Sequence, residues 1–149
     1  MRVLTVKRVY VNEKWCLGCH LCEYNCEFSN SGLDSMTKLK GVRINPRVRV
    51  EDDAAHDIHF AVSCRHCDDP LCMNGCIAGA ISRDETGTVV IDKNKCVGCY
   101  TCVAMCPYGA VMPDSNGHAA QKCELCTANG KKPACVEGCP NGAIVFEER

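Results

Sequence analysis

Apolar residues in this chain occur in short alternating runs, and turn-forming residues interrupt each run after a few positions. The runs at 79–81 (Gly-Ala-Ile) and 89–92 (Val-Val-Ile-Asp) flank a turn at 84–87, and this pattern predicts a small β-hairpin. Similar runs lie near the two ends, at 6–11 and 143–146, and each matches one strand of that hairpin. The pattern therefore predicts small antiparallel strand pairs.

The stretch 29–63 separates the first strand-like run from the hairpin. It contains a polar turn at 30–34, strand-like runs at 42–44 and 48–50, and a further run at 58–62. The alternation turns three arginines outward as a basic ribbon: Arg43, Arg47 and Arg49. Two interpretations stay open, a solvated hairpin that covers the neighbouring module and a docking surface for a larger partner.

Composition sets this chain apart because 16 of its 149 residues are cysteine, about 11%. Without them the apolar share falls to about 35%, with only one Trp, four Tyr and three Phe. Something bonded to the sulfur atoms must therefore replace part of the core. A net charge of −1 excludes a nucleic-acid protein that works through a basic surface.

The compartment is expected to be the cytoplasm. The first eight residues contain no apolar stretch of the secretory type, and the uncharged run 96–113 is interrupted by Gly, Cys and Pro, which argues against a membrane span. In a reducing compartment thiols bind metal and do not pair, so a disulfide scaffold is disfavoured.

The cysteines fall into four groups of four. The first and third groups have the spacing C-x2-C-x2-C-x3-C, and a proline follows the third. Bacterial ferredoxins have this run, in which three thiolates hold one cubane cluster and the fourth reaches a neighbouring cluster. Structural zinc is the alternative, but it needs thiol pairs and the run puts an odd third thiol into each set. Sixteen thiols correspond to four [4Fe-4S] clusters with none left over.

The segment from Cys76 through Cys106 to Val111 resembles a two-cluster bacterial ferredoxin, and the two ends of the chain resemble the same module cut open at its hairpin. The expected fold is α+β, with two nested ferredoxin-like modules of short helices and small antiparallel hairpins around four clusters. The expected boundaries are 1–28 with 112–149 for the split outer module, 29–63 for the spacer and 64–111 for the inner module.

The ferredoxin resemblance implies that each cluster takes its fourth ligand from the partner motif. The expected ligand sets are Cys16, Cys19, Cys22 and Cys139 for cluster 1; Cys123, Cys126, Cys135 and Cys26 for cluster 2; Cys64, Cys67, Cys72 and Cys106 for cluster 3; and Cys96, Cys99, Cys102 and Cys76 for cluster 4. The histidines are surplus to such ligation, and no catalytic constellation stands out.

Four glycines flank the ligand positions: Gly18, Gly98, Gly75 and Gly138. They either turn backbone N–H groups toward cluster sulfur or serve as simple turn residues. Arg65 and His66 lie between two ligands of the second group, where they either place positive charge beside a cluster or belong to a solvated loop.

The whole chain resembles the four-cluster iron–sulfur subunits of the dimethyl-sulfoxide-reductase type. Within that type it looks most like ferredoxin-like proteins that accompany CO dehydrogenases and like small subunits of tungsten aldehyde oxidoreductases. The segments that carry the likeness are W-C-L-G-C-H-L-C-E at 15–23, S-C-R-H-C-D-D-P-L-C at 63–72, K-C-V-G-C-Y-T-C at 95–102 and C-V-E-G-C-P-N-G-A-I-V-F-E-E-R at 135–149.

This resemblance implies a non-catalytic electron-transfer subunit. It would carry single electrons between a larger catalytic subunit, of the CO dehydrogenase, tungsten aldehyde oxidoreductase, formate dehydrogenase or hydrogenase type, and a soluble acceptor or second subunit. The acceptor would be a flavin-containing protein or a ferredoxin, and neither nucleic acid nor a membrane span is expected. A free polyferredoxin shuttle is the alternative.

Overall fold

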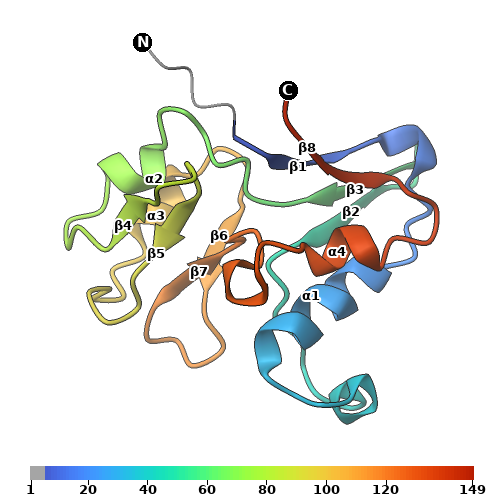
Figure 1. Cartoon of the computed structure of the whole chain (residues 1–149), viewed down its shortest axis with the longest axis horizontal. Helices are drawn as coiled ribbons and strands as arrows, with labels where there is room; N and C mark the ends of the chain where they lie inside the picture. The colour runs from blue at the N-terminus through green and yellow to red at the C-terminus, as the bar shows by residue number, and fades with distance from the viewer. Residues whose placement is uncertain (1–5) are drawn as a thin grey trace.

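A computed structural model describes residues 6–149 of the chain. Residues 1–5 lie outside the described residues. Two predictions rest partly on them, namely the absence of a signal sequence and the start of the outer module. Short helices and strands alternate along the rest (Figure 1), in the order β1 (Arg8–Val11), η1 (Glu13–Trp15), α1 (Leu21–Ser31), η2 (Met36–Leu39), β2 (Arg49–Asp53), β3 (Ile58–Val62), α2 (Leu71–Asn74), β4 (Ile81–Arg83), β5 (Val89–Ile91), α3 (Thr101–Met105), β6 (Val111–Pro113), β7 (Ala120–Lys122), η3 (Thr127–Asn129), α4 (Ala134–Glu137) and β8 (Ile144–Glu147). The α+β fold class predicted from the sequence is confirmed.

The strands of the described chain pair into small two-stranded sheets: β1 with β8, β2 with β3, β4 with β5, and β6 with β7. All four pairs are antiparallel. The predicted hairpin forms from β4 and β5, with Ile81 opposite Ile91. Asp84 closes its turn by accepting hydrogen bonds from the backbone N–H groups of Thr86 and Thr88, each at 2.9 Å.

The sheet of β1 and β8 brings together segments from the two ends of the chain (Figure 1). Val9 lies opposite Phe146 and Val11 opposite Ile144. The two runs that the sequence assigns to one split module are therefore neighbours in space. The division of the chain into an inner and an outer module stays a prediction.

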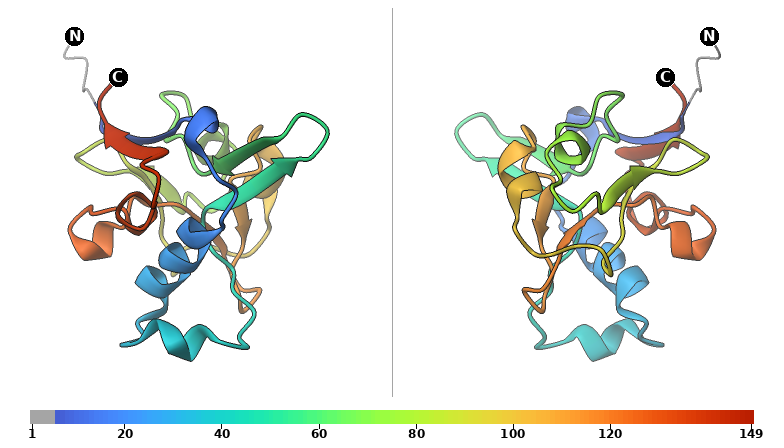
Figure 2. Two further views of the ribbon diagram at one scale, coloured as in Figure 1. Left: turned by 90° about the vertical axis from the view of Figure 1, so that its right-hand side faces the viewer. Right: turned by 90° about the vertical axis from the view of Figure 1, so that its left-hand side faces the viewer.

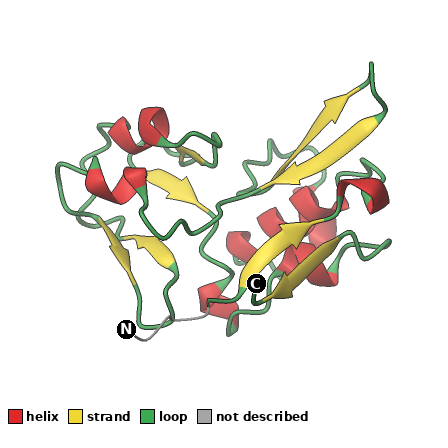
Figure 3. Cartoon of the chain, turned by 90° about the horizontal axis from the view of Figure 1, so that it is seen from above, coloured by secondary structure: helices red, strands yellow, loops and turns green. Residues whose placement is uncertain are grey.

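Two hydrophobic clusters form the interior, and cysteine side chains belong to both. One contains Cys72, Ile81, Val89, Ile91, Cys102, Val111 and Ala120. The other contains Cys22, Cys26, Val48, Ala61, Cys135 and Ile144. In Figure 3 the elements that contribute to these clusters form two groups side by side, with the β2–β3 hairpin at one corner.

The spacer differs from the expectation in two places. Helix α1 continues to Ser31 and ends at Gly32, whose φ of 71° is left-handed, so the predicted polar turn begins later. The run 42–44 forms no strand. The backbone of Asn45, just after this run, instead donates to Glu27 Oε2 at 3.2 Å and accepts from Gln121 Nε2 at 2.9 Å.

The predicted basic ribbon forms only in part, because Arg47 turns inward whereas Arg43 and Arg49 are exposed. The Arg47 guanidinium lies 3.7 Å from Glu124, with both side chains less than a quarter exposed. Arg49 Nη2 donates to the Gly109 carbonyl at 2.7 Å. Only Arg43 lacks such a contact among the described residues, and it is exposed.

The β2–β3 hairpin projects to one side of the molecule, as both views of Figure 2 show. Its base is attached to α1, because the Val50 N–H donates to Glu23 Oε1 at 2.7 Å. Within residues 6–149 no helix combines the length and apolarity needed to span a bilayer.

Candidate functional site

The first predicted set of thiols lines one cavity. Cys16, Cys19 and Cys22 lie around it together with Cys139, which follows α4. Burial raises the pKa of the Cys22 thiol to about 12, with Glu23 and the thiols of Cys16 and Cys19 adding to the rise. The structure therefore brings a distant cysteine to the thiols of the first motif.

The third predicted set lines a second cavity, of about 220 Å³. Its walls include Cys64, Cys67, Cys72 and Cys106, although Cys106 belongs to a different sequence motif. Burial raises the pKa of the Cys72 thiol, and the charges of Cys64 and Cys106 act in the same direction. All four members of this predicted set thus face one space.

The second predicted set collects around Cys135 on α4. Burial raises the pKa of this thiol, and the nearby thiols add to the rise: Cys123, Cys26, Cys126 and Cys22. Three of these four neighbours belong to the predicted set. Cys22 belongs to the first set, so the first and second sets are adjacent.

Two members of the fourth predicted set, Cys96 and Cys76, lie near a third member, Cys102 on α3. Burial raises the pKa of this thiol, and the charges of Cys96 and Cys76 add to the rise. Cys99 is exposed, and the Thr101 hydroxyl 3.4 Å from its Sγ lowers the pKa of this thiol.

Several backbone N–H groups point at cysteine sulfur. Cys26 Sγ accepts from the Arg47 N–H at 3.3 Å, Cys76 Sγ from the Ala80 N–H at 3.3 Å, and Cys64 Sγ from the His66 N–H at 3.4 Å. Such bonds stabilise thiolates and raise the reduction potential of a bound iron–sulfur cluster.

The four glycines beside the predicted ligands form two pairs with different backbone roles. Gly18 and Gly98 have φ of 64° and 70°, the left-handed conformation that the turn between two ligands requires. The N–H groups of Gly75 and Gly138 donate to the carbonyls of Leu71 and Ala134, each at 2.9 Å. At Gly75 and Gly138 the turn interpretation therefore holds.

His66 contradicts both interpretations made from the sequence. Its side chain is wholly buried, so it does not belong to a solvated loop. Burial, reinforced by the nearby positive charges of Lys122 and Arg8, lowers its pKa to about 3, so the ring is neutral at physiological pH. Nδ1 accepts from the Val89 N–H at 3.0 Å, which leaves the proton on Nε2, a buried atom without a partner among the described residues.

Sequence reasoning missed Lys122, which precedes Cys123. Its side chain has no solvent exposure, and its Nζ lies 3.5 Å from Cys64 Sγ. The flanking Ala119 and Ala120, both buried, were the only local sign that this stretch lies inside.

The other predicted residues lie outside the thiol sets. Arg65 is exposed and stacks on Tyr108, with its guanidinium carbon 4.5 Å from the ring centre. His20 and His59 bind carboxylates: His20 Nδ1 lies 3.0 Å from Glu23, and His59 Nδ1 lies 2.5 Å from Asp52.

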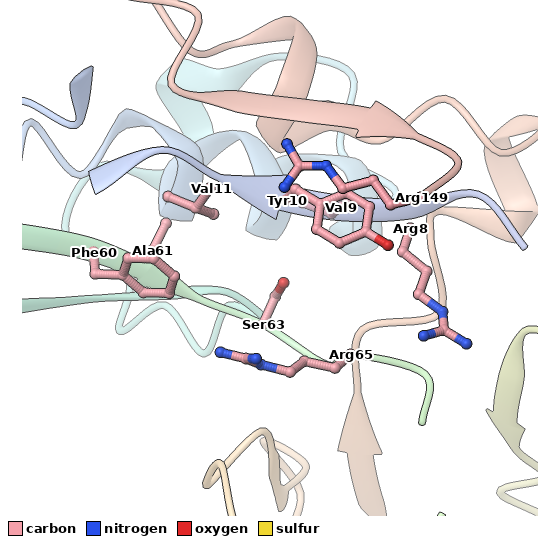
Figure 4. Close-up of a pocket in the computed structure, with 9 residues that line it drawn as sticks. All are labelled: Arg8, Val9, Tyr10, Val11, Phe60, Ala61, Ser63, Arg65 and Arg149. Carbon is pink, nitrogen blue, oxygen red and sulfur yellow. The ribbon is translucent and has the colours of Figure 1, made fainter. Parts of the chain in front are cut away.

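A further hollow, of about 270 Å³, lies between β1 and the end of β3 and is bordered by three arginines. Figure 4 shows their guanidinium groups pointing in different directions. Arg8 binds Asp68 at 2.5 Å, and Arg149 stacks on Tyr10 with its guanidinium carbon 4.3 Å from the ring centre. No cysteine lines this hollow, so it is separate from the thiol sets.

The residues around the thiols fit iron–sulfur clusters. Clusters with four thiolate ligands are anionic, and they accept hydrogen bonds at sulfur. The buried Lys122 and the unpartnered Nε2 of His66 are a positive charge and a donor that such a group would satisfy. In residues 6–149 no three His, Cys, Asp or Glu side chains are grouped to hold a single metal ion.

Comparison with known proteins agrees with this chemistry. The family model described as "4Fe-4S dicluster domain" matches residues 55–149. The thiosulfate reductase electron transfer subunit PhsB of Salmonella typhi is 35% identical, over 91% of this chain and 72% of its own length. The electron transport protein HydN of Escherichia coli K12 is 36% identical, over 90% of this chain and 83% of its own.

Another relative is a probable anaerobic dimethyl sulfoxide reductase chain, YnfG of Escherichia coli K12, which is 34% identical over 92% of this chain and 71% of its own length. A solved chain of the BamBC active-site complex of benzoyl coenzyme A reductase has the same fold. It has a TM-score of 0.50 and 23% identity, covering 97% of this chain and 78% of that one. The chain therefore belongs to the 4Fe-4S dicluster domain family, as a non-catalytic, ferredoxin-like iron–sulfur subunit of the electron-transfer type found in oxidoreductase complexes.

Proposed function

We propose that this protein carries single electrons, through four [4Fe-4S] clusters, between the catalytic subunit of a partner oxidoreductase and an acceptor. The ligand sets are those expected from the sequence: Cys16, Cys19, Cys22 and Cys139; Cys123, Cys126, Cys135 and Cys26; Cys64, Cys67, Cys72 and Cys106; and Cys96, Cys99, Cys102 and Cys76. The observation that carries the proposal is that two cavities are each lined by one of these quartets, in which one cysteine comes from a different motif.

A [4Fe-4S] cluster supplies reversible one-electron chemistry when bound. The protein's own residues contribute four thiolates per set, backbone N–H donors to sulfur and a buried setting. Because every ligand position is filled by a thiolate, no iron is left open for substrate, which agrees with a subunit that performs no catalysis itself.

The neighbourhood of the sets supports a linear arrangement. Cys22 of the first set lies near Cys135 of the second. Cys123 of the second set lies near Cys64 of the third. Cys72 of the third and Cys102 of the fourth belong to one hydrophobic cluster. Adjacent sets therefore follow one another from first to fourth.

The two ends of this arrangement are also the parts open to partners. Among the sixteen cysteines, only Cys19 of the first set and Cys99 of the fourth are exposed. Large apolar side chains adjacent in sequence to cysteines of these two sets are exposed: Trp15 and Leu17 next to Cys16 of the first set, and Ile77 and Val97 next to Cys76 and Cys96 of the fourth. We assign one end to the catalytic subunit and the other to the acceptor.

The partner is proposed as a larger catalytic oxidoreductase subunit, of the CO dehydrogenase, tungsten aldehyde oxidoreductase, formate dehydrogenase or hydrogenase type. The acceptor is a flavin-containing protein or a ferredoxin. The names of PhsB and YnfG add thiosulfate reductase and dimethyl sulfoxide reductase to the candidate classes of catalytic partner. Sixteen thiols favour a reducing compartment such as the cytoplasm. Anaerobic co-purification from the source cell identifies the partner, and native sizing without a larger subunit would favour a free shuttle.

Iron analysis of paired cysteine variants tests the ligand sets. The anaerobically purified protein is expected to hold about 16 iron atoms, four per cluster. If Cys26 and Cys123 share a cluster, changing both to serine removes one cluster and leaves about 12 iron atoms. Changing Cys26 and Cys16 instead removes two clusters and leaves about 8. Equal iron in the two double variants would refute the assignment, and a colourless or zinc-loaded wild type would refute the function.

A further inference from the structure

Lys122 is a buried cation without a carboxylate partner. It ends β7, and its side chain has no solvent exposure. The lysine–carboxylate ion pairs of the described residues involve other lysines, namely Lys38, Lys93 and Lys131. An isolated ammonium group is costly to bury, so the structure must provide negative charge nearby.

Its three N–H donors reach three different groups. Nζ lies 2.9 Å from the Cys123 carbonyl, 3.5 Å from Cys64 Sγ and within hydrogen-bond distance of the Val89 carbonyl on β5. An ammonium group has three donors, and these contacts use all of them. Lys122 is thus held in place between a cysteine of the third set and a cysteine of the second.

The charge of Lys122 acts on both sets. Its Nζ lies 3.5 Å from the Cys64 Sγ of the third set and 2.9 Å from the carbonyl oxygen of Cys123 in the second set. A cluster with four thiolates carries about −2 when oxidised and about −3 when reduced. A fixed positive charge stabilises the reduced form more, and this raises the reduction potential.

We propose that Lys122 is the shared counter-charge of the second and third clusters and raises the reduction potentials of both. Lys122 lies where the second set meets the third, so these two clusters are easier to reduce than they would be without its charge. The inference rests on the proposed function, because it assumes that both sets hold clusters.

The test compares reduction potentials, measured by anaerobic redox titration with low-temperature electron paramagnetic resonance. Lys122→Met removes the charge and keeps an apolar stem, whereas Lys122→Gln removes the charge and keeps a hydrogen-bond donor. Lys122→Arg keeps the charge. Lys40→Met, which removes an exposed lysine just after η2, is the control.

With iron content at the wild-type value, both neutral variants are expected to lower two of the four potentials. Lys122→Arg should stay close to wild type in both, and Lys40→Met should change none. Unchanged potentials, or a shift confined to one cluster, would overturn the proposal while leaving the four-cluster function intact. Loss of iron from Lys122→Gln would also overturn it, because Lys122 would then be a folding residue. A wild type without four clusters would refute the proposed function itself.

Discussion

Replacing Gly98 by alanine tests how tightly the loop between Cys96 and Cys99 is confined. Gly98 has φ of +70°, and a Cβ at this position would lie 2.8 Å from the backbone carbonyl oxygen of His118. The left-handed conformation costs an alanine roughly 1–2 kcal/mol. The close approach to a backbone atom adds a further cost, of about 1–3 kcal/mol by analogy with overpacked cores.

Gly117 provides a matched control. It has φ of +69°, but no atom lies within 4 Å of the place that an alanine Cβ would take. Gly117→Ala should therefore cost about 1–2 kcal/mol, from the conformation alone, whereas Gly98→Ala should cost about 2–5 kcal/mol. For a chain of this size each kcal/mol lowers the midpoint of thermal unfolding by roughly 2–4 °C.

The assay is the anaerobic thermal loss of the visible cluster absorption, together with iron content before heating. Gly98→Ala should lose absorption at a midpoint several degrees below that of Gly117→Ala and should release iron from the fourth set first. Equal midpoints for the two variants would refute the reasoning, because the difference between them rests only on the contact with His118.

The remaining predictions concern packing and charge. Ile144 in β8 is 4% exposed, so Ile144→Ala should lower the free energy of unfolding by about 2–5 kcal/mol. Ile77 is 77% exposed, so Ile77→Ala, the control, should change the free energy of unfolding by no more than about 0.5 kcal/mol. Thermal midpoints that fall equally in the two variants would contradict this prediction. The hydrogen bond to Glu23 raises the pKa of His20 above its usual 6.5, so this pair stabilises the fold fully below pH 6.5 and the contribution is lost as pH rises through the raised value. Glu23→Gln should therefore lower the thermal midpoint more at pH 5.5 than at pH 8.5, and a pH-independent difference would count against the pair.

Turn chemistry is a local property, and the sequence predicted the hairpin that follows from it. The hairpin of β4 and β5 forms around its predicted turn because alternating apolar residues and Asp84 favour it without help from distant segments. The strand partners β1 and β8 followed from internal repetition of the same pattern.

Features that depend on distant contacts could not be predicted in this way. The run 42–44 alternates like a strand, but the segment that follows it lies between Glu27 of α1 and Gln121 of β7. Arg47 looked exposed because its partner, Glu124, belongs to another motif. Lys122 and His66 are polar residues whose burial depends on several loops meeting around the thiols.

The segment from Asn45 to the start of β2 is a brace, in the sense that its hydrogen bonds connect separate parts of the fold. Asn45 Nδ2 donates to the Pro113 carbonyl at 3.1 Å, Arg49 to that of Gly109 at 2.7 Å, and the Val50 N–H to Glu23 on α1 at 2.7 Å. One short stretch of chain is thus tied to α1, beside the first two thiol sets, and to β6 and the loop that precedes it. In the proposed relay, this segment would help to fix the distance between the clusters that an electron crosses, and the tunnelling rate falls steeply as that distance grows. A loosened brace would slow transfer without altering a single iron ligand.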